Sequence, residues 1–291
     1  MKERISFPDY IISVVFVFAS LGLLSYIGSN IQSDVINPVG KAMGDFELTD
    51  IVFSYMRERP GEDTNLVLVN IGDLGRDGIA EEINILNKYN PKVIGIDAFF
   101  RKPKGRNEDG VDVDSALATA FSKVKNLILV SKVNRYNEKT DTHDTLELSN
   151  PMFSQYAMSG MSNMISEGYD VFKTSRTISP QEKVKDTVEM AFAVKLAKIY
   201  NPKAVEKLMD RGNETEIINY QGNFDPKVNE ISPNARNVFT ALDVSQVLNE
   251  EFNPDIIRNK IILMGYMGPN WDKITWEDKF FTPLNKRSKI L

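Results

Sequence analysis

Two aspartates stand directly after apolar segments that are typical of buried β-strands. Asp73 follows the run 66–71 by two positions, and Asp97 follows the run 93–96 immediately. Ligands of an open parallel sheet bind beyond the carboxyl ends of its strands, so we expect both carboxylates at that edge. Two acids that share a cleft raise each other's pKa and can exchange protons with a substrate. The alternative interpretation is that each carboxylate caps the turn or helix that follows it.

Composition and motifs exclude several other kinds of catalytic site. The chain has no cysteine, which removes disulfides, thiolate nucleophiles and thiolate metal sites. Its single histidine, His143, lies in a polar stretch that we interpret as a solvated loop. The sequence has no nucleophile elbow, P-loop or dinucleotide fingerprint in a suitable place. We therefore expect no cofactor and no metal ion.

Basic residues follow the second acidic strand end, at Arg101, Lys102, Lys104 and Arg106. We interpret this stretch as a solvated loop, and an anionic ligand at the sheet edge is the alternative. The formal net charge of the whole chain is −5, so a polyanion is not attracted by the chain as a whole. The sequence predicts no nucleic acid partner.

The first half of the chain predicts strands that alternate with helices. Apolar, largely β-branched runs indicate strands at 66–71, 93–96 and 127–130. A helix with Asp77 as its N-cap is expected to end at Tyr89, and a second is expected to start at Asp114 or Ser115 and to end at Phe121. Short crossovers of this kind imply parallel pairing.

The second half is less regular. Residues 152–183 contain no long periodic segment, although 160–165 suits a strand. We expect helices at 184–200 and 241–248 and strands at 217–220 and 261–264. The predicted fold class is α/β, with a mostly parallel sheet and flanking helices, preceded by one N-terminal transmembrane helix.

Residues 10–27 are uncharged and predict that transmembrane helix, because about 20 apolar residues span the hydrocarbon core of a membrane. Lys2 and Arg4 precede the span, which places residues 1–9 in the cytoplasm and the domain outside it. A cleaved signal peptide is the alternative. We expect a connector at 28–44 and an extracytoplasmic domain at 45–291.

Several segments, in their order along the chain, resemble one family. They are ELTDIVFSYMRER with Asp50, VLVNIGD, PKVIGIDAFF, DSALATAF, NLILVSKV, GMSNMISEGYDVFKTSRT with Asp170 and Arg176, AFAVKLA, INYQG, KIILMGYM, and DKFFTP from Asp278 to Pro283. Residues 45–285 thereby resemble the CHASE type-two sensory domains, the cyclase/histidine-kinase-associated sensing extracellular domains.

The resemblance implies an N-terminal membrane helix, an extracytoplasmic α/β sensor and a signalling output. The two strand-end acids above, together with Arg176, Asp278 and Thr282, are the ligand-binding candidates. The family's tryptophan- and proline-rich turn is missing after Asp73, and its Gly-x-x-x-His-Ala segment is missing after Thr282. We therefore expect an incomplete C-terminal part, or a sensor that acts through a partner.

The function predicted from these observations is a non-enzymatic sensory domain, anchored in the cytoplasmic (inner) membrane of a bacterium through residues 10–27. Its expected partners are a small-molecule or protein signal and a second copy or another signalling protein. Two alternatives stay open. One is a membrane-tethered hydrolase that uses Asp73 and Asp97, and the other is an envelope scaffold without a ligand.

Overall fold

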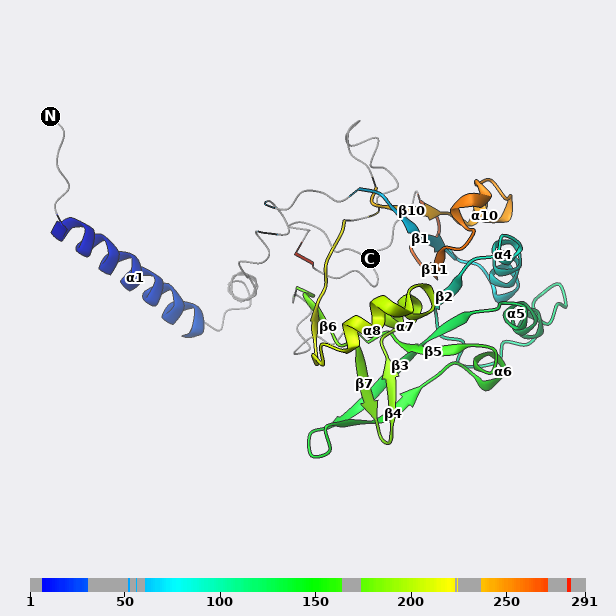
Figure 1. Ribbon diagram of the computed structural model, residues 1–291, viewed down its shortest axis with the longest axis horizontal. Coiled ribbons are helices and arrows are strands. Elements are labelled where there is room, and N and C mark those ends of the chain that lie inside the picture. Colours follow the sequence, from blue (N-terminus) through cyan, green and yellow to red (C-terminus); the bar gives the residue numbers. More distant parts are fainter. Residues whose placement is uncertain are drawn as a thin grey trace.

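In the computed structural model, the described residues are 7–30, 52, 56, 61–163, 174–222, 224, 237–271 and 282–283 (Figure 1). Most of them form an α/β domain around one large sheet. Within this part of the chain the sheet has nine strands, and its main path runs in the order β10-β1-β11-β2-β3-β4-β7-β8, with β5 paired to β3. The predicted class, a mostly parallel sheet with flanking helices, is confirmed.

The parallel part of the sheet holds the core. Its strands are β10 (Phe239–Leu242), β1 (Asp63–Asn70), β11 (Ile261–Gly265), β2 (Val93–Asp97), β3 (Leu127–Asn137) and β5 (Met158–Met161). The predicted strands at 66–71, 93–96, 127–130 and 261–264 correspond to β1, β2, β3 and β11. One expectation is wrong, however, because β1 and β2 are not neighbours. The last strand, β11, lies between them and pairs with both in parallel.

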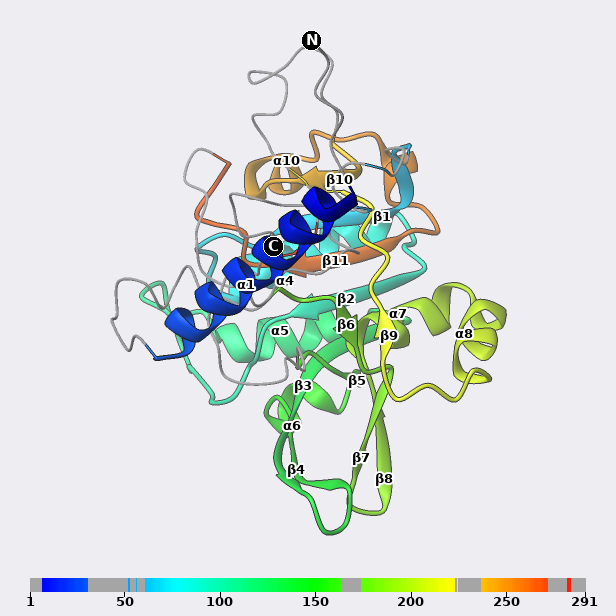
Figure 2. The same cartoon turned by 90° about the vertical axis from the view of Figure 1, so that its left-hand side faces the viewer.

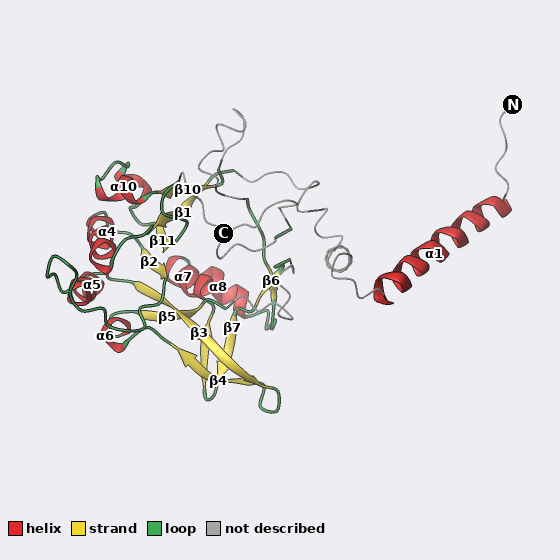
Figure 3. Ribbon diagram, turned by 180° about the vertical axis from the view of Figure 1, so that it is seen from behind, coloured by secondary structure: helices red, strands yellow, loops and turns green. Residues whose placement is uncertain are grey.

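Helices cover both faces of this sheet (Figure 3). One face carries α4 (Arg76–Lys88), α5 (Val113–Ser122), α6 (Pro151–Ser154) and α10 (Val244–Leu248), and the other carries α7 (Phe192–Tyr200), with α8 (Pro202–Met209) packed beside it. Because successive side chains of a strand point to opposite faces, each central strand contributes to both layers. Ile94 and Ile96 pack under α4 and α5, whereas Val93 packs under α7.

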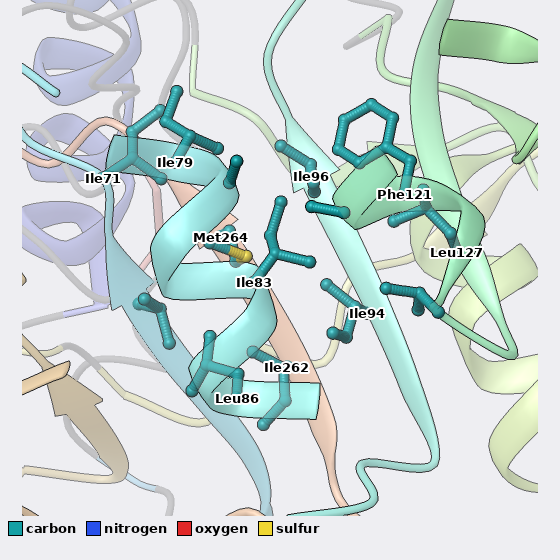
Figure 4. Close-up of a cluster of buried hydrophobic side chains, with 14 of the residues drawn as sticks. Ile71, Ile79, Ile83, Leu86, Ile94, Ile96, Phe121, Leu127, Ile262 and Met264 are labelled. Atoms are coloured by element: carbon teal, nitrogen blue, oxygen red, sulfur yellow. The ribbon is translucent and has the colours of Figure 1, made fainter. Parts of the chain in front are cut away.

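The larger core lies between α4, α5 and the strands (Figure 4). Ile83 and Leu86 of α4 are fully buried against Ile262 and Met264 of β11 and their neighbours. This is the apolar face that the spacing of 79, 83 and 86 predicts. Burial of each such side chain contributes about 1.5–3 kcal/mol, so the sheet and its helices form a rigid support for the strand ends.

On the opposite face, two glycines let α7 approach the sheet. A Cβ atom at Gly160 of β5 would lie 2.8 Å from the backbone Cα of Phe192. A Cβ atom at Gly95 of β2 would lie 2.8 Å from side-chain atoms of both Phe192 and Leu196. Side chains at these two positions would push the helix away, so the glycines set the spacing between α7 and the strands.

The irregular middle of the chain forms a mostly antiparallel extension of the sheet, which projects away from the parallel part (Figure 2). The long strand β3 continues into a hairpin with β4 (Thr142–Glu147), and β7 (Gln181–Val184) and β8 (Thr187–Met190) form a second hairpin. A separate pair joins β6 (Thr177–Ile178) to β9 (Glu216–Ile217). The expected strand at 160–165 is present at 160–161, in β5, and residues 164–165 lie outside the described residues. The expected strand at 217–220 is present only at 217, in β9.

The helix expected at 184–200 is wrong in its first half. Residues 184–190 belong to the β7–β8 hairpin, which turns at Lys185 with a φ of 52°, and the helix starts only at Phe192. β-Branched residues precede that point, and they fit a strand better than a helix. Likewise, residues 241–242 of the helix expected at 241–248 belong to β10.

His143 is not in a solvated loop as expected. It lies on β4 with a side chain that is 14% exposed, and its Nε2 is 3.6 Å from Oε2 of Glu182 on β7. The ring of Tyr136 packs beside it, with ring centroids 5.3 Å apart. The single histidine therefore belongs to the contact between the two hairpins.

Two predicted helix caps also differ. Gly75 occupies the N-cap of α4, and the carboxylate of Asp77 accepts a hydrogen bond from Asn107 Nδ2 at 2.9 Å instead. Asp112 caps α5 and accepts from the backbone N–H of Ser115 at 3.0 Å. Asp114, the acid expected at the start of that helix, forms an ion pair with Arg76 instead.

The N-terminal helix α1 spans Phe7–Asn30. Its side chains are described only for residues 12–23, so the ends of the expected span 10–27 lie outside the described side chains. No helix in the described part of the chain has both the length and the apolar character that a membrane span requires. The start of the expected domain, residues 45–60, also lies outside the described residues, except for Val52 and Met56.

Candidate functional site

The two strand-end acids lie on strands that are separated by β11. In the register of the sheet, Gly265 pairs with Asn70 on one side and with Asp97 on the other. Adjacent strands are about 4.8 Å apart, so the ends of β1 and β2 are about 10 Å apart. Asp73 and Asp97 are both exposed. The fold therefore does not provide the neighbouring strands on which the prediction of a paired-acid site depended.

The other candidate residues lie elsewhere in the chain. Arg176 is half-buried directly before β6, and its carbonyl oxygen accepts a hydrogen bond from the N–H of Ile218 at 2.8 Å. Thr282 is 6% exposed, and its buried hydroxyl has no hydrogen-bond partner within the described part of the chain. Asp278 lies outside the described residues, as do Asp50 and Asp170.

A polar cluster that the sequence did not single out organises the carboxyl end of β1. Asn70 is the last residue of that strand and is completely buried. Its Nδ2 donates to Oδ1 of Asp243 at 2.9 Å and to the carbonyl oxygen of Gly268 at 3.0 Å. Its Oδ1 accepts from the N–H groups of Gly72 at 3.1 Å and Met267 at 2.9 Å. Asn70 thus uses both its donors and both its acceptor positions within the chain.

Asp243 links this cluster to α10. It follows β10, is 7% exposed and caps the helix by accepting a hydrogen bond from the N–H of Val244 at 3.0 Å. The side chain of Gln246 accepts in turn from the backbone N–H of Asp243, which completes a capping box. Its Oδ2 accepts from the N–H of Trp271 at 3.1 Å. One carboxylate therefore joins β10, β1 and the chain that follows β11.

These contacts fold residues 266–271, which we call the strand-end segment, over the ends of β1 and β10. Gly72 lies beneath it with a φ of 48°, and a Cβ atom there would be 2.9 Å from the carbonyl oxygen of Pro269 and 2.8 Å from a methyl group of Val244. Only glycine fits both this backbone conformation and this close approach. The segment occupies the edge where an open sheet of this type binds ligands.

A buried acid lies next to this cluster. Glu82 of α4 is 0% exposed, and neither of its carboxyl oxygens has a hydrogen-bond partner within the described part of the chain. Burial, and secondarily the charge of Asp243, raise the pKa of Glu82 to about 8. The carboxyl group therefore keeps its proton at neutral pH, unlike an ordinary glutamate.

A second buried contact holds the basic loop that follows β2. Arg76 forms a buried ion pair with Asp114 of α5 and donates to the carbonyl oxygen of Lys102 at 2.7 Å. Burial would raise the pKa of Asp114, but bonds from the N–H of Gly105, from Arg76 and from the N–H of Lys104 lower it overall. The loop expected to be merely solvated is therefore fixed by backbone contacts to a buried carboxylate.

The polar side chains at the described strand ends form hydrogen bonds, and the neighbouring Glu82 holds a proton at neutral pH. Within the described residues, no group of three or more histidine, aspartate or glutamate side chains is placed to hold a metal ion. The sequence carried one signal for Glu82, because an acid at 82 stands beside the apolar positions 79, 83 and 86 of the predicted helix. For Asn70 and Asp243 the signal was absent, since both look like ordinary strand-end residues.

A family comparison agrees with the fold. Residues 43–290 match the family model of the CHASE2 domain, which covers most of the chain and contains the range 45–285 that the ordered motifs indicated. No curated protein and no solved structure matches the chain. The family consists of sensory domains found in signalling proteins. The chain therefore belongs to the CHASE2 domain family.

Proposed function

We propose that this chain is a membrane-anchored, extracytoplasmic sensory domain of a bacterial signal-transduction protein, and that it acts by binding rather than by catalysis. The observation that carries the sensory role is the family match over residues 43–290. In this proposal, a small-molecule or protein signal shifts the domain between conformations, and a second copy or a partner protein transmits the change.

The described side chains of α1, residues 12–23, support the proposed membrane anchor, although this stretch alone is shorter than a span requires. Its described side chains are mostly apolar and exposed, and Phe16 and Phe18 are exposed to 72% and 69% on different sides of the helix. A helix that is apolar all round suits either a protein core or a lipid environment. Lys2 and Arg4 before the span favour a cytoplasmic N-terminus with the α/β domain on the other side.

The strand ends support binding over catalysis. Hydrolysis through a proton shared by Asp73 and Asp97 would need adjacent carboxylates, and their strands are separated by β11. The buried side chains of Asn70 and Asp243 bond to the chain itself, so they are engaged in holding the strand ends together rather than presented to a substrate. We propose Asp73, Asp97, Arg176, Asp278 and Thr282 as the residues to test for ligand contact.

The absence of cysteine allows a direct test of topology, because an introduced cysteine is the only thiol in the chain. Glu3→Cys reports on the N-terminus and keeps both Lys2 and Arg4, and Asp73→Cys reports on an exposed position of the domain. A membrane-impermeant maleimide should label Asp73→Cys in intact spheroplasts and Glu3→Cys only after permeabilisation. Ser131→Cys, at a completely buried position, is the control that should stay unlabelled in both. Labelling of Glu3→Cys in intact spheroplasts would overturn the proposed orientation.

Binding is tested by thermal unfolding of the purified full chain against a panel of amino acids, sugars and organic acids. A ligand at 100 times its Kd stabilises the folded state by about 2.7 kcal/mol, so binding raises the melting temperature. Asp73→Asn and Asp97→Asn should reduce the shift if these carboxylates contact the ligand. If no compound shifts the melting temperature and a captured protein partner leaves the conformation of the domain unchanged, the scaffold alternative replaces the sensory proposal.

A further inference from the structure

The two hairpins of the extension meet at the single histidine of the chain. Each hairpin is well paired in itself, with five register pairs between β3 and β4 and four between β7 and β8. The strands β4 and β7, by contrast, are joined by one register pair, His143 with Val184. The N–H of Lys185 also donates to the carbonyl oxygen of His143 at 3.1 Å. The hairpins are therefore two firm units, and the contact at His143 is a weaker joint between them.

The ring of His143 lies between two groups that favour a positive charge. Its Nε2 is 3.6 Å from Oε2 of Glu182 on the other hairpin, and the two side chains are only 14% and 22% exposed. The ring of Tyr136 lies beside it, with centroids 5.3 Å apart. A carboxylate attracts a nearby cation, and an aromatic ring attracts a cation within about 6 Å of its centroid. A charge on His143 would strengthen both contacts, and the one with Glu182 bridges the hairpins.

The second hairpin gains from a cation at this place. Glu182 and Glu189 are directly opposite each other in the β7–β8 ladder, so their side chains lie on the same face. Like charges in this arrangement destabilise a hairpin. Glu189 is buried, and its carboxylate accepts a hydrogen bond from Oγ of Ser131 at 2.7 Å. A positive charge on His143 beside Glu182 offsets the repulsion between the two acids.

The buried Nδ1 of His143 opposes this gain. It has no hydrogen-bond partner within the described part of the chain, and a charged imidazole carries a proton on both nitrogens. Protonation therefore leaves one buried donor unpaired. The new charge, however, acts on Glu182 and on Tyr136 at the same time, and contacts of charged groups are about twice as strong as neutral hydrogen bonds. We therefore expect the joined hairpins to favour the protonated ring.

Other charged groups near the ring are exposed or engaged elsewhere. Nζ of Lys183 is 3.4 Å from Oδ2 of Asp141, and these side chains are 63% and 69% exposed. Asp141 also accepts from the hydroxyl of Tyr136 at 2.8 Å. The remaining charged residues of the hairpins near this joint are all exposed: Arg135, Glu138, Lys139, Asp144, Lys185 and Asp186. Solvent and salt screen such charges, so Glu182 acts most directly on His143.

We propose that His143 is a proton-operated joint between the β3–β4 hairpin and the β7–β8 hairpin. When His143 is protonated, its ion pair with Glu182 holds the hairpins together. When the ring loses its proton, the ion pair is lost and the hairpins move apart at the single register pair. Histidine ordinarily changes its charge between about pH 5 and pH 8, so mild acidification tightens the joint. This inference goes beyond the sensory proposal and does not depend on membrane topology.

The absence of cysteine allows two spin labels to be placed, one on each hairpin. Thr140→Cys and Val188→Cys are exposed positions, and neither substitution changes a charge. Double electron–electron resonance on the labelled full chain in detergent, frozen at pH 5 and at pH 8, gives the distribution of distances between the labels. We expect a narrow distribution at pH 5 and a broader one at pH 8. The ratio of separated to joined hairpins should rise about fivefold or more, as is typical of coupled sites.

Two variants of the labelled chain test the two partners of the joint. His143→Gln is uncharged at every pH and should give the broad distribution at both pH values. Glu182→Gln removes the opposite charge and should do the same. Glu138→Gln is the matched control, because it changes an exposed acid of the first hairpin and should keep the transition.

Circular dichroism of each variant at both pH values separates movement of the hairpins from unfolding. The proposal is overturned by a transition that persists in His143→Gln or in Glu182→Gln. It is equally overturned if the labelled parent chain shows no transition, if its distribution is narrower at pH 8 than at pH 5, or if the transition coincides with a loss of secondary structure.

Discussion

At the scale of single residues, the buried acid Glu82 determines how stability changes with pH. Its pKa is 4.5 in the reference state and about 8 in the folded chain, so the folded chain binds more protons than the unfolded chain between these values. The contribution of Glu82 to the free energy of unfolding is therefore fully present below pH 4.5. It falls as the pH rises to about 8, by up to about 1.4 kcal/mol per pH unit. Above that window the loss from this group is complete.

Glu82→Gln should remove this pH-dependent contribution. The variant should gain stability over the parent chain progressively from pH 5 to pH 8, because the glutamine side chain stays neutral throughout. The amide itself also changes the free energy of unfolding, by an amount that does not vary with pH. The quantity to follow is therefore how the difference in unfolding free energy between variant and parent changes with pH. Urea unfolding of both proteins at pH 5, 7 and 9 measures it. A difference that stays constant over this range would show that Glu82 titrates normally.

Asn70 provides a second prediction at this scale. Asn70→Ala leaves the buried N–H of Met267 and carbonyl oxygen of Gly268 without partners, and each such group costs about 1–3 kcal/mol. We expect a loss of at least about 2 kcal/mol in the free energy of unfolding. Asn65→Ala, at an exposed position of the same strand, removes one bond from the hydroxyl of Tyr200 and should cost about 1 kcal/mol or less. Equal losses in urea unfolding would show that Asn70 is not central to the strand ends.

Sequence reasoning located the acids at strand ends but not the residues that organise those ends. Asp73 and Asp97 stand out because they directly follow apolar runs. Asn70 is bonded to residues 173 and 197 positions away in the chain, and no local pattern encodes such partners. The importance of Glu82 likewise depends on the side of α4 that faces α10, which becomes known only once the helices are packed.

At the scale of elements, composition identified the central strands and could not order them. Continuous β-branched runs mark β1, β2 and β11 because strands buried on both faces must be apolar throughout. Their lateral order depends on which gap the last strand fills. β11 enters between β1 and β2, and a right-handed crossover from β10 is compatible with more than one position. Periodicity holds no information on that choice.

The loop after β2 yields a prediction at the same scale. Arg76→Ala leaves Asp114 buried without its cation and frees the carbonyl oxygen of Lys102, so we expect a loss of about 3–5 kcal/mol in the free energy of unfolding. Arg101→Ala is the matched control. It breaks the ion pair with Glu147, whose side chains are 54% and 35% exposed, and should cost at most about 1 kcal/mol.

Guanidinium chloride unfolding of the two variants makes this comparison, and limited proteolysis of the loop 101–112 gives an independent readout. Cleavage there should accelerate in Arg76→Ala and stay slow in Arg101→Ala. If both variants lose similar stability, the buried pair is not what fixes the loop to α5.

At the scale of the whole molecule, the order of short motifs was more informative than any single motif. Segments such as VLVNIGD and PKVIGIDAFF are ordinary strand ends when taken alone. Their common order indicated the sensory family, and the match over residues 43–290 confirms it. Periodicity missed β4 and the β7–β8 hairpin, because short strands are decided by their partners in the sheet.

The proposed anchor gives a prediction for the molecule as a whole. Phe18→Asp combined with Leu21→Asp places two carboxylates at the centre of the span 10–27, and each costs about 2.5–3.5 kcal/mol for membrane insertion. The double variant should leave the membrane fraction on alkaline carbonate extraction, whereas the parent chain should stay in it. Phe18→Leu with Leu21→Phe keeps the apolar character at the same positions and should behave as the parent does. Retention of the double aspartate variant would mean that another feature holds the domain in the membrane, and extraction of the parent chain would mean that α1 is not a membrane span.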